Sequence, residues 1–257
     1  MEVFLNPSAW IALLTLTFLE IVLGIDNIIF ISIATGKLPT EKRKKATQIG
    51  LFLAMFLRIA LLMGISVLIA MKEAWFTIDF SWFTAQITGQ SLILFLGGLF
   101  LLYKSTTEIR EKIEEKGVEE KQLGKSAAKQ FSRVLLQIML IDLVFSFDSI
   151  LTAVGMTNGV PGAIYIMVTA VVISVFIMMQ FAVPVGIFVN KHPTIQILGL
   201  TFLVLIGFML ITESAHLANA SFFGNHVDVV PKGYLYFAIS FSLLVEVLNM
   251  KMSKNKK

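Results

Sequence analysis

The stretches FLEIVLGIDNIIFIS (residues 18–32) and MLIDLVFSFDSILTA (residues 139–153) decide the fold. Each is an apolar segment that carries two acids, and the two align without a gap. The matched pairs are Glu20 with Asp142, Gly24 with Ser146, Asp26 with Asp148, and Asn27 with Ser149. Since two acids recur at the same spacing, we interpret the segments as copies of one repeat rather than as a chance resemblance between apolar helices.

Composition indicates that lipid surrounds these segments. The chain has 257 residues, of which 56% are hydrophobic and only 15% are charged. A water-soluble domain of this length carries more charge and less apolar surface. Cysteine is absent, which excludes disulfides and thiolate metal sites. The net charge of +4 comes from basic residues in loops and at the tail, so it indicates membrane topology and no nucleic-acid partner.

Seven segments are long and apolar enough to span a bilayer, which takes roughly 20 residues as a helix. The third is short unless it begins inside the preceding loop, near Phe83. The predicted spans are residues 10–34, 47–71, 90–103, 131–156, 162–189, 194–212 and 233–250.

Basic residues set the predicted orientation of these spans. They gather after the first span (Lys37 and residues 42–45), in the charged loop 104–130 after the third, and in the tail KMSKNKK (residues 251–257). Positive loops stay on the cytoplasmic side. We therefore expect an all-α polytopic membrane protein with its N-terminus outside and its C-terminus in the cytoplasm.

The two acid-bearing segments form an inverted repeat under this topology. Three spans separate their starting points, so the first copy crosses the membrane in one direction and the second in the other. We expect one membrane domain over residues 1–257, with repeats at about 1–103 and 131–212, the cytoplasmic loop 104–130 between them, and an extra helix at 233–250. Inverted repeats are typical of transporters that work by alternating access.

The acids need a cationic counterpart, because a carboxylate at the bilayer centre costs roughly 2.5 to 3.5 kcal/mol on insertion scales. Arg58 is the only basic residue deep in a predicted span, and one guanidinium does not balance all of them. Protons or a metal ion must supply the rest. Carboxylate, amide and carbonyl oxygens favour manganese, magnesium or calcium, while the lack of cysteine and of deep histidines argues against zinc or copper.

Helix geometry places the acids at successive depths along the helices rather than around a single metal site. Glu20 and Asp26 lie about 120° and 9 Å apart on a straight helix, so they cannot chelate one ion. A break at Gly24 or at Ser146 would free carbonyl oxygens to join them. Measured from the predicted midpoints, Asp26 and Asp142 fall towards the cytoplasm, and Glu20 and Asp148 towards the outside.

Three segments carry a family resemblance: LEIVLGIDNIIFIS (19–32), QIMLIDLVFSFDSILTAVGM (137–156) and VPKGYLYFAISFSLLVEVLN (230–249). The chain resembles the TerC family of bacterial membrane proteins from about residue 10 to 249, in its short branch without appended CBS and transporter-associated domains. The resemblance implies a multi-pass protein of the bacterial inner membrane, manganese export, and a distant relation to the lysine-exporter superfamily. Tellurium chemistry is a weaker implication. The implied ion-pathway residues are Glu20, Asp26, Asn27, Asp142 and Asp148.

We therefore expect a secondary transporter that exports a divalent ion, Mn²⁺ first, as substrate, with proton exchange as a plausible coupling. Ser149, Arg58 and Glu246 are accessory candidates, and no cofactor is implied. Two rivals remain open: a membrane-protein insertion or assembly factor without transport, and an exporter of an organic cation. An enzyme is not expected, because no nucleophile–base pair or cofactor motif is present. Assembly into a homo-oligomer also remains open.

Overall fold

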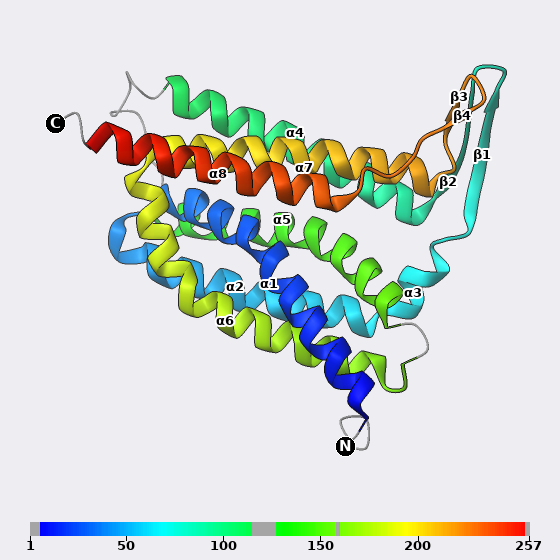
Figure 1. The fold of residues 1–257 in the computed structure, drawn as a ribbon, viewed down its shortest axis with the longest axis horizontal. Coiled ribbons are helices and arrows are strands. Elements are labelled where there is room, and N and C mark those ends of the chain that lie inside the picture. The colour runs from blue at the N-terminus through cyan, green and yellow to red at the C-terminus, as the bar shows by residue number, and fades with distance from the viewer. Residues whose placement is uncertain (1–5, 115–126, 158–159, 255–257) are drawn as a thin grey trace. The chain divides into compact units, whose positions relative to one another are not determined.

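Seven long helices dominate the computed structural model, which describes residues 6–114, 127–157 and 160–254. Within these residues all seven have the length and hydropathy to cross a membrane, which confirms the predicted number (Figure 1). They are α1 (Pro7–Gly36), α2 (Thr40–Met63), α4 (Gly89–Glu114), α5 (Ala127–Met156), α6 (Ala163–Lys191), α7 (Pro193–Leu217) and α8 (Lys232–Lys254).

Local sequence sets where these helices begin. The side chain of Asn6 caps α1 by accepting a hydrogen bond from the Ser8 amide at 3.1 Å, and Pro7 follows at the first helical position. α7 also begins with a proline, Pro193. The predicted second span was too long: it breaks at Gly64, and residues Ile65–Ala70 form a separate short helix, α3.

The third span, α4, begins at Gly89, one residue before its predicted start, and it ends later than predicted. Residues 83–88 are not helical but form strand β2 (Phe83–Thr88), which pairs with β1 (Ala74–Phe80) in an antiparallel hairpin. Two short strands, β3 (Ser221–Phe222) and β4 (Asn225–His226), complete the sheet in the order β1-β2-β3-β4. Helix α4 gains its length at the other end, where it continues to Glu114 in the charged loop; residues 115–126 of that loop lie outside the described part.

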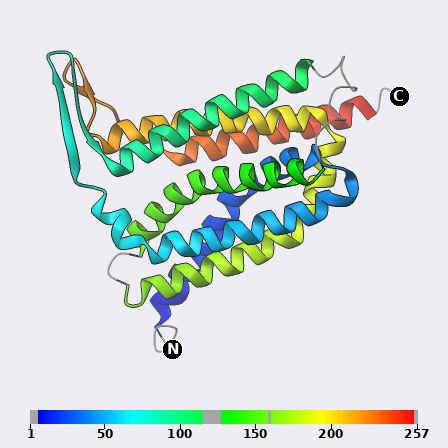
Figure 2. The ribbon, with the colours of Figure 1, turned by 180° about the vertical axis from the view of Figure 1, so that it is seen from behind.

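The chain divides into two compact units, and each takes segments from both halves of the sequence. The first contains α1, α2, α5 and α6. The second contains the sheet, α4, α7 and α8. Within the first unit, α2 lies between α5 and α6 in both Figures 1 and 2. α1 packs against α6 in the same unit, as α5 packs against α2.

The buried faces of α2 and α6 repeat each other. A shift of 120 residues carries every buried residue of α2 onto a buried residue of α6, including Arg58 onto Met178 and Ala54 onto Ser174. In α1 and α5, Glu20 and Asp142 are likewise both buried. α2 and α6 thus share one burial pattern although their sequences differ; the inverted orientation of the two halves stays a prediction.

Glycines bring α4 and α7 into direct backbone contact in the second unit. A Cβ atom added to Gly98 would lie 2.7 Å from the carbonyl oxygen of Gly207, and one added to Gly207 would lie 3.0 Å from that of Gly98. Such reciprocal approach needs small residues on both helices.

Gly98→Ala is therefore expected to destabilise the protein by about 1 to 3 kcal/mol, because a backbone atom cannot move aside as a side chain can. Gly155→Ala is the matched control, since a Cβ there meets nothing within 4 Å. Unfolding of the two variants in detergent by denaturant measures the difference. Equal stabilities would contradict the close approach.

Candidate functional site

Arg58 lies at the centre of a charged cluster inside the first unit. It sits on the buried face of α2 with only 2% of its surface exposed. A guanidinium in so apolar an environment requires anionic partners to offset its desolvation.

Two carboxylates from the repeated helices bind this arginine. Its Nη1 donates to Glu20 Oε2 on α1, and its Nη2 donates to Asp142 Oδ1 on α5 at 2.9 Å. Both carboxylates are buried, at 4% and 5% exposure. The ionised cluster then carries two negative charges and one positive, so it retains a net negative charge.

Two neutral groups hold the Asp142 carboxylate in place. Asn27 Nδ2 on α1 donates to Oδ1 at 3.2 Å, and Ser146 Oγ donates to Oδ2 at 3.0 Å. Ser146 follows Asp142 by one helical turn, which places both on one face of α5. Helices α1, α2 and α5 thus meet at Arg58. Two carboxylates bind its guanidinium, and two neutral side chains bind one of those carboxylates.

Glu20 and Asp142, predicted on opposite sides of the membrane midplane, both bind the Arg58 guanidinium; their depths in the membrane stay a prediction. Helix α5 begins at Ala127, four residues before the predicted residue 131. The midpoint of the helix moves with it, so each acid lies within about 2 Å of the midpoint of its own helix at 1.5 Å per residue.

The other candidate residues take different positions on α1, α5 and α8. Asp148 is half-buried on α5, and its backbone carbonyl accepts a hydrogen bond from Thr152 Oγ1 at 3.1 Å. Ser149 is buried and donates to the Ser146 carbonyl at 3.3 Å. Asp26 lies on α1 one turn past the cluster, but its side chain is outside the described part. Glu246 is on α8 in the second unit.

Both acid-bearing helices are continuous, so the anticipated breaks at Gly24 and Ser146 are not seen. At Gly24 the glycine serves packing instead, because Met178 of α6 presses its sulfur into the space where a Cβ would lie. Among the side chains the structure describes, no three His, Cys, Asp or Glu residues gather as a ready metal site.

The cluster is closed to bulky or hydrated solutes on the side of Glu20. The cavity beside this residue measures about 10 Å³ and is otherwise lined by apolar side chains such as Leu16, Leu62 and Ile150. A volume of that size holds about one water molecule. The space beside Glu20 therefore has no room for a hydrated ion.

The sequence predicts Arg58 only as an accessory residue and predicts no polar contact for Ser146. The signals for both were present. Arg58 is the single basic residue deep in a span, and a serine four positions after an aspartate shares its helix face.

Comparison with known proteins agrees with this architecture. Residues 5–257 match the family described as Integral membrane protein TerC family. The chain belongs to the TerC family. It is 47% identical to the UPF0053 inner membrane protein YgdQ of Escherichia coli over 251 residues, covering 97% of this chain and 95% of that protein. It is 44% identical to a UPF0053 protein of Haemophilus influenzae, covering 97% and 96%.

Longer relatives contain the same membrane part. The UPF0053 inner membrane protein YoaE of Escherichia coli is 44% identical over 256 residues, which are 99% of this chain and 45% of that protein. No solved structure matches the chain significantly. Together with the seven apolar helices, membership in the TerC family identifies a multi-pass protein of the bacterial inner membrane.

Proposed function

We propose that this TerC-family protein is a secondary transporter that exports a divalent metal ion from the cytoplasm, with Mn²⁺ as the leading candidate substrate. The observation that carries the proposal is the pair of buried carboxylates, Glu20 on α1 and Asp142 on α5, that already hold the guanidinium cation of Arg58. Two acids from symmetry-related helices form a site that both faces of the membrane can reach in turn.

The groups around Arg58 match the ligand preferences of Mn²⁺. If the guanidinium withdraws, the two carboxylates that held it face the vacated position. Rotation of the Asn27 amide, which now donates to Asp142 Oδ1, would add a further oxygen. Oxygen donors of this kind suit manganese over zinc or copper.

Arg58 acts in this proposal as a resident cation that alternates with the substrate. When the metal ion leaves, the guanidinium returns to Glu20 and Asp142, so two bare carboxylates are never left in the low-dielectric interior. Because Arg58 competes for the same carboxylates, it also lowers their affinity for Mn²⁺ and so allows the ion to be released.

Asp26 and Asp148 provide the outer steps of the pathway. Their backbone positions lie roughly 7 and 10 Å from the midpoints of α1 and α5, each towards the C-terminal end of its helix. Because the repeats are inverted, these ends face opposite sides of the membrane. Protons taken up by the acids after release would balance the export of a dication.

Reconstituted liposomes test the function directly. Purified protein in vesicles that enclose a Mn²⁺-sensitive dye is expected to carry externally added Mn²⁺ to the dye and to move protons the other way. Parallel assays with Mg²⁺ and Ca²⁺ rank the substrates. Mn²⁺ flux no faster than in protein-free vesicles would overturn the proposal.

A further inference from the structure

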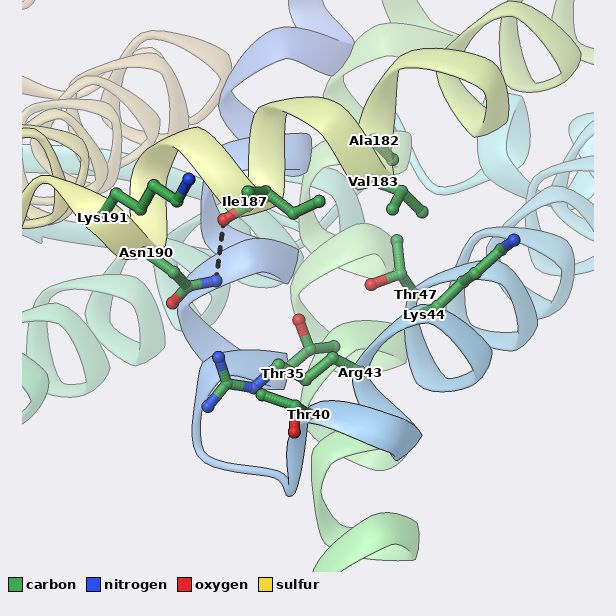
Figure 3. A pocket seen from close by; sticks show the side chains of 11 residues that line it. Thr35, Thr40, Arg43, Lys44, Thr47, Ala182, Val183, Ile187, Asn190 and Lys191 are labelled. Atoms are coloured by element: carbon green, nitrogen blue, oxygen red, sulfur yellow. Dashed lines mark hydrogen bonds between the residues drawn. The ribbon is translucent and has the colours of Figure 1, made fainter.

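A cavity of about 510 Å³ opens at one end of the first unit, between α1, α2 and α6 (Figure 3). It lies away from the charged cluster: neither Glu20 nor Asp142 lines it. The function proposed above makes no use of it.

The charges that line this cavity are all positive. Arg43 and Lys44 come from the first turns of α2, and Lys191 comes from the last turn of α6 on the opposite wall. No carboxylate is among the eleven lining residues. Glu41 is close in sequence but exposed and outside the lining.

The start of α2 adds to this positive field. The helix begins at Thr40, also a lining residue, and its N-cap is Pro39, which supplies no side-chain hydrogen bond to the first turn. Uncapped amides at a helix N-terminus attract anions through their N–H groups and the helix dipole. A divalent cation would be repelled here, so the cavity is not its pathway.

The rest of the cavity wall is apolar. Ala182, Val183 and Ile187 of α6 extend it from the basic residues towards the membrane-spanning part, and Ile187 is 55% exposed. The charged first turns of α2 give way to a mainly apolar segment from Ile49 onwards, which is the order expected where a helix passes from the headgroup region into the hydrocarbon core. A ligand that fills the cavity must combine an anionic group with a hydrocarbon chain.

We propose that this cavity binds an anionic phospholipid, with its phosphate among Arg43, Lys44 and Lys191 and an acyl chain along Val183 and Ile187. Basic pockets between membrane helices bind acidic headgroups in this manner. A free phosphate would satisfy the charges but leave the apolar wall uncovered.

Native mass spectrometry of the full chain in detergent, titrated with phosphatidylglycerol, tests the proposal. The wild-type protein is expected to retain one lipid more tightly than the rest, and to retain phosphatidylcholine weakly. The double variant Lys44→Gln, Lys191→Gln should bind phosphatidylglycerol about 30-fold more weakly, which corresponds to roughly 1 kcal/mol for each basic residue. Arg43 is left in place because its Nε also bonds the Leu38 carbonyl at 2.8 Å.

Lys45→Gln is the matched control, since Lys45 is exposed on the same helix but does not line the cavity. It should leave lipid binding unchanged. Two results would overturn the proposal: equal lipid retention by the double variant and the wild type, or displacement of the lipid by millimolar inorganic phosphate alone, which would indicate a soluble anion. A Val183→Asp variant that keeps its fold by circular dichroism should also lose the lipid, because a charge on the wall repels the acyl chain.

Discussion

Replacing Arg58 by methionine is expected to lower the free energy of unfolding by about 3 to 5 kcal/mol, the range found when one member of a buried ion pair is removed. The guanidinium holds the Glu20 and Asp142 carboxylates, and both are buried. Without it, two like charges face each other in an apolar interior. Denaturant unfolding of the purified variant in detergent measures the loss.

A triple variant separates charge from packing. Adding Glu20→Gln and Asp142→Asn to Arg58→Met removes all three charges, and most of the lost stability should return, because uncharged groups of similar volume replace a buried ion pair at little cost. Arg110→Gln is the control. Arg110 pairs with Glu114 on the exposed end of α4, and its loss should cause no measurable change. Equal stabilities of the single and triple variants would show that Arg58 matters for its shape and not for its charge.

Hydropathy predicted the membrane-spanning helices because lipid imposes one simple requirement, a long apolar segment with its backbone hydrogen bonds satisfied internally. The sheet obeys no such rule. Strand β1 (Ala74–Phe80) is almost entirely exposed, so it lacks the alternation of buried and exposed residues that marks a strand in sequence. Its pairing with β2, and that of β2 with β3 across more than 130 residues of chain, arises from tertiary contact.

In the candidate site, too, the sequence predicts some features, and others depend on tertiary packing. The repeated acids were visible in sequence because charge in an apolar segment is conspicuous. Their convergence on Arg58 was not, because it depends on the packing of α2 beside both α1 and α5.

Asp142→Asn is expected to reduce Mn²⁺ flux in reconstituted liposomes to the level of protein-free vesicles. The substitution removes a charge from the proposed ion site and leaves Arg58 bound to Glu20 alone. The dye assay measures the loss. Asp79→Asn is the control, since Asp79 is exposed on β1, and its flux should match the wild type. Flux through Asp142→Asn at the wild-type rate would exclude the cluster from the pathway.

Arg58→Gln should also stop Mn²⁺ flux, but by strengthening binding where Asp142→Asn weakens it: the ion binds and does not leave. At about 4 Å, one guanidinium interacts with a carboxylate by roughly 4 kcal/mol at an effective dielectric constant of 20. In the wild type, Arg58 competes with Mn²⁺ for the same carboxylates. If the substitution removes roughly 2.7 kcal/mol of that competing interaction, Mn²⁺ binds on the order of a hundredfold more tightly. Mn²⁺ titrations of thermal stability measure the affinity, since a bound ligand stabilises the folded state. Added Mn²⁺ should stabilise Arg58→Gln more than the wild type, yet have little effect on the double variant Arg58→Gln, Asp142→Asn. Equal Mn²⁺ responses in all three proteins would mean that the guanidinium and the metal ion do not share these carboxylates.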